Sequence, residues 1–430
     1  MKQSIAIIGL GFVGLPLALA FVNKGHRVAG IDLDWRKLEL LRQGRSYLPD
    51  VSDGQVKEAV ERGDLTVTED FAVISGTDAV VICVPTPLTA WHTPDLSYLQ
   101  QAAEAIRPHL RQYQLVVLES STYPGTTKEV LLPILMKRGL VVGRDLFLAY
   151  SPERIDPGNP HYSLETIPKV ISGVTERCLE AIDSLYSTVF EHIVAVSSTE
   201  AAEMAKLLEN SYRFVNISFI NEFASICEAM RLNAWEIIEA AGTKPYGFTA
   251  FLPGPGIGGH CIPVDPLYLR WKARHFGAES KFIDASLKVN ANMPRYMVQR
   301  LKESLRVPSL GGLRLLLIGL TYKRDIGDTR ESSAIETMKL LVREGAELSY
   351  YDPFVPEMRL DGTTWKSVEL SEANLAASDG VIILTDHSQI AWQRIVEHAQ
   401  FVYDTRNVTV SMSGRARIVR LGVGIQETFS

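Results

Sequence analysis

The chain has 430 residues, of which 46% are hydrophobic, and its formal net charge is −6 at pH 7. This length predicts two or three domains, and the negative charge argues against a protein that binds nucleic acid. Four widely spaced cysteines argue against a disulfide framework or a structural zinc site, and short apolar runs argue against a membrane span, so we expect a cytoplasmic protein.

The first predicted elements form a strand–helix–strand unit. An apolar run at residues 4–8 leads into Gly9-Leu10-Gly11-Phe12-Val13-Gly14, a helical pattern follows, and a second strand at 27–31 ends in Asp32. In this context the three glycines allow a tight turn, close approach of a pyrophosphate, and close packing of helix on strand. Asp32 is placed to bind the adenosine ribose and to repel a 2′-phosphate, which favours NAD over NADP; the neighbouring cation Arg36 argues the other way.

Further strands are predicted at 78–84, 115–119, 145–150 and 169–171, with helices between them. Polar loops follow three of these strands: Pro85-Thr86-Pro87, Ser120-Ser121-Thr122 and Ser151-Pro152-Glu153-Arg154. Ligands bind at the carboxyl ends of strands in an open parallel sheet, so we expect these loops to line the site. Cys83 falls in an apolar strand and is interpreted as a core residue.

A long helix is predicted over residues 199–230. Glu203, Lys206 and Asn210 share one face of it. Two interpretations remain open: a solvated face with a Glu–Lys pair, or a lysine and an asparagine aimed into a cleft beside the nicotinamide. The helix is apolar enough to form a subunit interface, so we expect a homodimer or a higher homo-oligomer.

A glycine-rich loop at residues 254–266 contains Cys261, followed four residues later by Asp265. Glycines let the backbone lie close to a ligand, and a thiol there is a candidate nucleophile toward a carbonyl carbon. The alternative is a buried apolar cysteine. Metal ligation by His260 is disfavoured because no second ligand is spaced near it.

The last third of the chain repeats the pattern of the first. Residues 315–320, 348–352 and 379–384 echo the strands at 5–10, 28–32 and 78–83, and another strand is predicted at 401–404. We therefore expect an α/β protein with two Rossmann-like doubly wound domains joined by a long central helix, divided at 1–198, 199–305 and 306–430. The second domain lacks the glycine motif. Lys323, Arg330 and Arg406 lie near its strand ends, either as surface charges or as ligands of a diphosphate.

Taken in order, these motifs resemble the UDP-sugar 6-dehydrogenase family from end to end. The resemblance rests on the Gly9–Gly14 loop, Ser121-Thr122, Ser151-Pro152-Glu153, Lys206 with Asn210, Gly258-Gly259-x-Cys261 with Asp265, Lys323-x-Asp325 and Asp328-x-Arg330-Glu331-Ser332. It implies oxidation of a sugar C6 hydroxymethyl group to a carboxylate by two hydride transfers to NAD, in the synthesis of surface polysaccharide precursors.

The resemblance also implies roles. Cys261 forms a thiohemiacetal and then a thioester, Lys206, Asn210 and Asp265 support it, and Glu153 and Thr122 handle protons. The implied NAD-binding residues are Gly9, Gly11, Phe12, Val13, Gly14, Asp32, Pro85, Thr86, Thr122 and Arg330. The implied substrate-binding residues are Glu153, Arg154, Lys206, Asn210, Gly258, Lys323 and Arg406.

Two departures from the UDP-glucose branch of that family bear on the sugar. Val264 stands where that branch has a lysine, and Pro157 stands where it often has a second acid. The sequence resembles the branch for UDP-N-acetylhexosamines instead, with UDP-N-acetylglucosamine favoured over the mannosamine epimer by Pro263 and Tyr268. UDP-glucose oxidation, a dehydrogenase that stops after one hydride transfer, and a sensor that binds NAD or a nucleotide sugar without turnover remain alternatives.

Overall fold

The computed structural model describes residues 2–48, 50–155, 162–259 and 261–424. The chain forms two compact units, which we call the N-unit (Met1–Glu209 and Val264–Glu279) and the C-unit (Asn210–Pro263 and Ser280–Ser430). Helix α7 (Thr199–Ala229) contributes residues to both units. Pro157 and His260, on which two sequence interpretations depend, lie outside the described residues.

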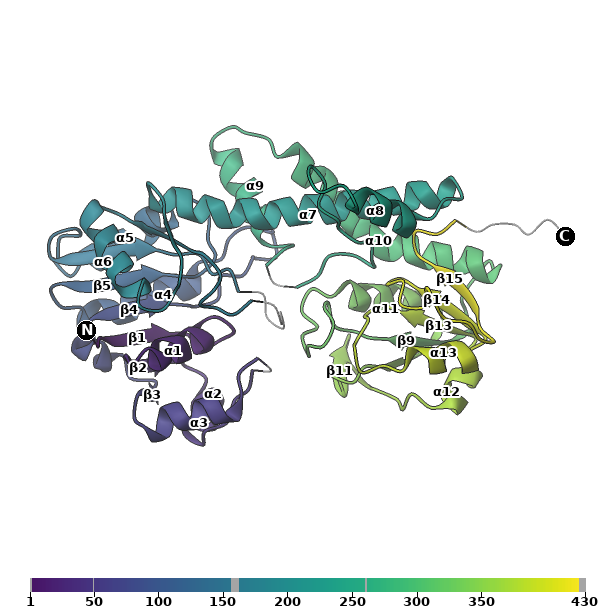
Figure 1. Ribbon diagram of the computed structural model, residues 1–430, viewed down its shortest axis with the longest axis horizontal. Helices are drawn as coiled ribbons and strands as arrows, with labels where there is room; N and C mark the ends of the chain where they lie inside the picture. Colours follow the sequence, from purple (N-terminus) through teal and green to yellow (C-terminus); the bar gives the residue numbers. More distant parts are fainter. Residues whose placement is uncertain (1, 49, 156–161, 260, 425–430) are drawn as a thin grey trace. The chain divides into compact units, whose positions relative to one another are not determined.

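The N-unit is built on a sheet whose described strands have the order β3-β2-β1-β4-β5-β6-β7-β8 (Figure 1). The strands are β1 (Ser4–Ile8), β2 (Arg27–Ile31), β3 (Leu65–Thr68), β4 (Ala79–Ile82), β5 (Gln114–Leu118), β6 (Leu146–Tyr150), β7 (Lys169–Gly173) and β8 (Ile193–Ala195). The neighbours pair in parallel except β6 and β7, which are antiparallel. This reversal places the first residue of β7 at the carboxyl end of β6, where sequence analysis predicted the site.

Both faces of this sheet are buried, as continuous apolar strands require. Ile5 and Ile7 face a core that includes residues of α1, α2, α3 and α6, whereas Ala6 and Ile8 face a core that includes residues of α4, α5, α7 and α9. The helices are α1 (Gly14–Asn23), α2 (Trp35–Arg42), α3 (Asp53–Glu61), α4 (Ser97–Ile106), α5 (Leu132–Met136), α6 (Glu176–Tyr186) and α9 (Asp265–His275). Successive side chains of β1 therefore point to opposite faces of the sheet, and each face is covered by its own layer of helices.

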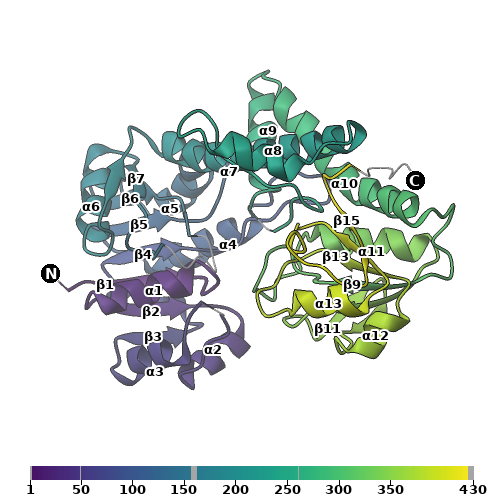
Figure 2. The same cartoon turned by 45° about the vertical axis from the view of Figure 1, so that its right-hand side comes forward.

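The C-unit holds a second parallel sheet of order β10-β9-β13-β14-β15, seen from two directions in Figures 1 and 2. Its strands are β9 (Arg314–Ile318), β10 (Glu347–Tyr351), β13 (Gly380–Ile383), β14 (Phe401–Asp404) and β15 (Arg417–Arg420). Its helices are α8 (Ala234–Gly242), α10 (Lys281–Leu305), α11 (Ser333–Arg343), α12 (Glu372–Ala377) and α13 (Trp392–His398). Leu315 and Leu317 pack with α10 and α11, while Leu316 and Ile318 pack with α12 and α13.

The predicted fold class, two doubly wound units with a long helix, is confirmed. The features that went unpredicted include the strands β3, β8 and β15, the antiparallel direction of β7, and the antiparallel hairpin of β11 (Glu357–Leu360) and β12 (Thr363–Lys366). Across the described ranges, no helix combines the length and the apolar character that a bilayer span needs.

Candidate active site

The glycine loop after β1 leaves one stretch of backbone open. Gly9 has φ +90°, and a Cβ there would lie 2.6 Å from the carbonyl oxygen of Cys83. A Cβ on Gly14 would lie 1.9 Å from the carbonyl oxygen of Gly9, whereas a Cβ on Gly11 would meet no atom within 4 Å. Packing therefore requires Gly9 and Gly14, and the open surface at Gly11 fits a pyrophosphate beside the start of α1. Phe12 and Val13 complete this turn, with Phe12 exposed.

Asp32 is held rigidly at the end of β2. Its Oδ2 accepts the backbone N–H of Leu10 at 2.9 Å, and its Oδ1 accepts that of Asp34 at 2.9 Å. Lys37 Nζ lies 3.2 Å from Oδ2. Carboxylate oxygens accept more than one hydrogen bond each, so ribose hydroxyls can still bind there. The turn and the carboxylate together fit the adenosine diphosphate half of NAD.

The loop after β4 is held by two other elements of the N-unit. Thr86 donates its hydroxyl to the carbonyl oxygen of Ser121 at 2.6 Å. The buried Tyr268 on α9 donates its hydroxyl to the carbonyl oxygens of Thr86, at 2.7 Å, and of Pro87, at 3.2 Å. Tyr268 thus fixes the backbone of a predicted cofactor loop, while Pro85 is exposed.

Thr122 and Glu153 follow the carboxyl ends of β5 and β6, and both are buried. Glu153 Oε1 accepts the backbone N–H groups of Arg154, at 2.7 Å, and of Ile155, at 2.5 Å. Within the described part of the chain, Thr122 Oγ1 and Glu153 Oε2 are buried and have no hydrogen-bond partner. Buried polar atoms normally have partners, so each of these two oxygens is available to a ligand or a water.

Arg154, predicted to bind substrate, uses its guanidinium within the N-unit. Its Nη2 lies 2.7 Å from Glu209 Oε1, and its Nη1 donates to the carbonyl oxygen of Pro168 at 2.6 Å. These contacts fix the direction of the chain just beyond Glu153.

A buried charged cluster lies next to Glu153. Lys169 Nζ is 2.9 Å from Glu119 Oε2 and 3.5 Å from Glu153 Oε2, and Tyr186 donates its hydroxyl to Glu119 Oε1 at 2.5 Å. Burial raises the pKa of Glu119 to about 7, against the lowering effect of Lys169. Burial lowers the pKa of Lys169, but the nearby Glu119 and Glu153 outweigh it and the net shift is upward. Lys169 therefore remains a cation.

The solvated-face interpretation of α7 is wrong for two of its three residues. Glu203 and Asn210 are buried, and Lys206 is half-buried. Both oxygens of Glu203 accept hydrogen bonds within the N-unit, from the backbone N–H groups of Gly125 and Thr127 and from the Thr127 hydroxyl. Glu203 thus anchors the start of the helical segment Thr127–Leu131. Asp265, the first residue of α9, is also buried.

In the C-unit, the loop that carries Cys261 is anchored by side chains from two helices. Asn221 on α7 accepts the N–H of Gly254 at 2.9 Å, and Asn290 on α10 accepts the N–H of Ile257 at 2.6 Å. Gly258 and Gly259 pack on Tyr322, whose atoms would lie 2.7 Å from a Cβ on either glycine. The glycines therefore allow close packing of the loop, and Cys261, which ends it, is exposed.

The three predicted anion-binding cations lie in the C-unit in different settings. Lys323 is half-buried on the loop after β9. Arg330 is paired with Asp328, which raises the pKa of Arg330, and the carbonyl oxygen of Arg330 accepts the N–H of Gly259 at 3.2 Å. Arg406 donates from Nε to the carbonyl oxygen of Leu384 at 2.8 Å, and its Nη1 would lie 2.9 Å from a Cβ on Gly254. Arg330 and Arg406 are therefore both close to the cysteine loop.

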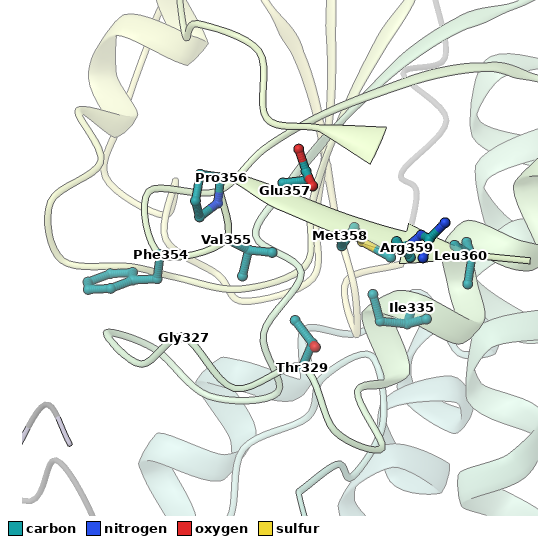
Figure 3. Close-up of a pocket in the computed structure, with 10 residues that line it drawn as sticks. All are labelled: Gly327, Thr329, Ile335, Phe354, Val355, Pro356, Glu357, Met358, Arg359 and Leu360. Atoms are coloured by element: carbon teal, nitrogen blue, oxygen red, sulfur yellow. The ribbon is translucent and has the colours of Figure 1, made fainter. Parts of the chain in front are cut away.

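A pocket of about 360 Å³ lies elsewhere in the C-unit, beneath β11 (Figure 3). Its lining residues are Gly327, Thr329, Ile335, Phe354, Val355, Pro356, Glu357, Met358, Arg359 and Leu360. None of them is a predicted site residue, so this pocket is not the candidate active site.

The chain matches all three domains of the UDP-glucose/GDP-mannose dehydrogenase family: the NAD binding domain over residues 3–190, the central domain over 200–292 and the UDP binding domain over 316–411. The chain belongs to this family. It is accordingly an NAD-dependent nucleotide-sugar dehydrogenase, as the resemblance implied, and NAD is its cofactor.

Relatives of this dehydrogenase act on different sugars. The UDP-N-acetyl-D-glucosamine 6-dehydrogenase of Pseudomonas aeruginosa is 36% identical over 90% of each chain. The solved structure of the UDP-D-ManNAc dehydrogenase of Pyrococcus horikoshii has a TM-score of 0.88 and 30% identity, over 98% of this chain and 100% of that one. A UDP-glucose dehydrogenase structure from Pyrobaculum islandicum has a TM-score of 0.89 and 29% identity, over 99% and 98%.

The predicted site residues of this dehydrogenase are divided between its units. The N-unit holds the predicted NAD-binding residues apart from Arg330, together with Glu153, Arg154, Lys206 and Asp265; the C-unit holds Asn210, Gly258, Cys261, Lys323, Arg330 and Arg406. Sequence reasoning missed Glu119, Lys169, Tyr268 and Tyr322 as parts of these surroundings. A charged residue directly bordering an apolar strand was the available signal for Glu119 and Lys169.

Proposed function

We propose that this dehydrogenase oxidises the C6 hydroxymethyl group of a UDP-N-acetylhexosamine, with UDP-N-acetylglucosamine favoured, to the uronic acid. The observation that carries the proposal is an exposed cysteine, Cys261, at the end of a glycine loop fixed by Asn221 and Asn290. An anchored, exposed thiol suits covalent catalysis, which holds the aldehyde stage of a four-electron oxidation on the enzyme. NAD supplies the hydride acceptor in both oxidations.

Oxidation of the alcohol gives the C6 aldehyde, one hydride and one proton. The Cys261 thiolate attacks the aldehyde carbon, and the carbonyl oxygen takes up a proton to give a thiohemiacetal; loss of a second hydride and a proton then gives a thioester. Water then attacks the thioester carbon, the carbon–sulfur bond breaks, and the carboxylate, the thiolate and two protons are released. Lys206 and Asn210 stabilise the oxyanion and Asp265 assists.

Glu153 and Thr122 handle the protons in this scheme, directly or through water. Each has a buried oxygen with no hydrogen-bond partner among the described residues, as expected of groups that await a substrate hydroxyl or a water. The fixed Oε1 of Glu153 leaves Oε2 as the atom that receives the proton.

Substrate binding is assigned to the remaining predicted residues. Lys323 and Arg406 bind the diphosphate or the sugar, supported by Gly258 and Arg154. Arg330 is proposed to bind NAD phosphate. Charge-assisted hydrogen bonds from lysine and arginine are well suited to anionic phosphate oxygens.

Two alternatives from the same chemistry are the mannosamine epimer and UDP-glucose, since relatives named for each resemble this chain to similar degrees. An alternative of another class is a sensor that binds NAD and a nucleotide sugar without turnover. Exposed Cys261 favours the enzyme.

The test is NADH production by the purified protein with each of the three UDP-sugars, counted per sugar consumed. We expect about two NADH per acetamido sugar, as two hydride transfers require. About one NADH would contradict the thioester route, turnover of UDP-glucose alone would overturn the sugar assignment, and binding without NADH would favour the sensor.

We also propose that the chain is a homodimer through α7. Tyr212, Phe219 and Ile226 recur every seven residues on this helix and are each 47% exposed or more. An exposed apolar stripe of this kind suits a partner helix. Light scattering should give twice the mass of the chain, and Phe219→Asp should give a monomer; a monomeric wild type would refute the proposal.

A further inference from the structure

The antiparallel strand β7 brings a lysine to the edge of the sheet that carries Glu153. Tyr150 pairs with Ser172, and the contact continues where Ser151 donates its hydroxyl to the carbonyl oxygen of Val170 at 2.8 Å. Lys169 Nζ then donates to the carbonyl oxygen of Pro152 at 3.3 Å and lies 3.5 Å from Glu153 Oε2. In a sheet with a parallel β7, this end of the strand would lie at the opposite edge.

The cation is held in place by a second carboxylate. The side chains of Lys169 and Glu119 are 4% and 0% exposed, and their charged atoms are 2.9 Å apart. A buried ion without a partner costs several kcal/mol, so each group requires the other. Tyr186 donates to the second oxygen of Glu119, and Lys169 Nζ lies 5.1 Å from the centre of the Phe190 ring. The pair is therefore fully enclosed within the N-unit.

Only one oxygen of Glu153, Oε2, faces the Lys169 cation. Its Oε1 is occupied by the two backbone N–H groups of Arg154 and Ile155, and its Oε2 faces Lys169. The distance of 3.5 Å to Lys169 leaves Oε2 without a hydrogen bond from any described residue. An ammonium at that distance attracts the carboxylate without occupying the oxygen that must take a proton.

We propose that Lys169 is a positioning residue for Glu153, and that Glu119 holds Lys169 in place for this task. The proposal rests on the proposed function, in which Glu153 accepts protons during oxidation. The titratable groups around Lys169 are Glu119 after β5, Glu153 after β6, Tyr186 on α6 and Cys83 after β4. In this proposal Glu119 fixes the position of the Lys169 cation, and that cation lies beside the oxygen of Glu153 that takes the proton.

The experiment removes the cation without leaving a buried anion. Lys169→Met alone would leave the buried Glu119 without its ionic partner. It is therefore combined with Glu119→Gln, whose amide oxygen can still accept the hydrogen bond from the Tyr186 hydroxyl. The readout is kcat/KM against pH, together with the thermal midpoint and NAD affinity. Three single variants are the controls. Lys169→Arg keeps the positive charge, and Glu119→Gln leaves Glu153 as the carboxylate partner of Lys169. Glu153→Gln removes the carboxylate that is proposed to take the proton.

In the double variant we expect the acid limb of the kcat/KM profile to move to higher pH, because the cation that faces Glu153 Oε2 is gone. We expect kcat to fall roughly tenfold, less than the ~10²–10⁴-fold loss expected for Glu153→Gln. Lys169→Arg should keep the wild-type limb, and so should Glu119→Gln, because Glu119, with its pKa raised to about 7, is already protonated at the pH of the acid limb. NAD affinity should stay within about threefold throughout.

An unmoved acid limb in the double variant overturns the proposal; if that variant does not fold, an unmoved limb in Lys169→Gln, which also removes the cation, overturns it. A parallel fall of stability, kcat and NAD affinity with no change in pH dependence would show a structural role only. Full activity of Glu153→Gln would instead refute the role of Glu153 in the proposed function. Absence of NADH formation by the wild type would refute the function itself.

Discussion

Asp352 occupies the same place in the sheet of the C-unit that Asp32 occupies in the sheet of the N-unit. The N–H of Leu320 donates to Asp352 Oδ2 at 2.7 Å, and that of Phe354 to Oδ1 at 2.8 Å, matching the bonds of Asp32. The difference lies in what covers the carboxylate. His387 accepts the N–H of Asp325 on Nδ1, so its Nε2 carries the proton that faces Asp352 Oδ2 at 3.2 Å. Asp352, which corresponds in position to the predicted ribose-binding residue Asp32, is thus hydrogen-bonded to His387 within the C-unit.

Asn substitutions at these two acids should affect different properties, cofactor binding at Asp32 and stability at Asp352. Asp32→Asn should raise KM for NAD about tenfold or more, since a charge-assisted hydrogen bond contributes about 1.5–3 kcal/mol, and should narrow the preference for NAD over NADP. Asp352→Asn should leave KM for NAD unchanged and lower the thermal midpoint. Steady-state kinetics with both cofactors, alongside thermal melts, measure this. Equal effects on KM from both variants would contradict the assignment of Asp32.

The same pair predicts how stability depends on pH. Burial alone would raise the pKa of Asp352, but hydrogen bonds from His387 and Leu320 outweigh it and hold that pKa below its ordinary value. Its stabilising effect is therefore present above the unfolded pKa of about 3.9 and is lost as pH falls through the lower folded pKa. Thermal melts of wild type and Asp352→Asn should differ above about pH 5 and converge in stronger acid. A constant difference would contradict the lowered pKa.

Alanine at Gly14 and at Gly11 should separate folding from cofactor binding. Gly14→Ala places a Cβ 1.9 Å from the carbonyl oxygen of Gly9 and should destabilise the N-unit by about 3 kcal/mol or more. Gly11→Ala meets no atom within 4 Å, so it should fold normally yet weaken NAD binding by about tenfold or more. Thermal melts and NAD titration measure the two effects. Normal NAD affinity of Gly11→Ala would show that the pyrophosphate does not contact this backbone.

Alkylation should select one of the four thiols. Cys261 is exposed, whereas burial and Glu119 raise the pKa of Cys83 far above its ordinary value, and burial and Glu228 raise that of Cys227. Cys178 is buried. Since the thiolate is the reactive form, iodoacetamide should label Cys261 first and abolish acid formation. Peptide mass spectrometry identifies the labelled residue, and Cys261→Ala, which should fold and bind NAD, is the control. First labelling at Cys83 would contradict the prediction.

The strands that begin each unit could be predicted from sequence because their signals are local. A strand–helix–strand unit is predicted by continuous apolar runs, by the spacing of three glycines and by an acid at the end of the second strand. The observed bounds of β1, β2 and β14 are the predicted ones. The long central helix was predicted within one residue for the same reason. Exposed Cys261 likewise follows a local pattern of glycines.

Only the tertiary structure decided which charged residues share an environment. Glu119 and Lys169 are fifty residues apart in sequence, and they meet because β5, β6 and β7 are adjacent and β7 is antiparallel. The apolar period of a five-residue strand carries no information on strand direction, so the position of Lys169 could not be read from sequence. Likewise, one interpretation of the sequence placed Glu203 on a solvated face of α7, but the structure shows it buried. There its carboxylate accepts the backbone N–H groups of Gly125 and Thr127, which would otherwise be buried without a partner.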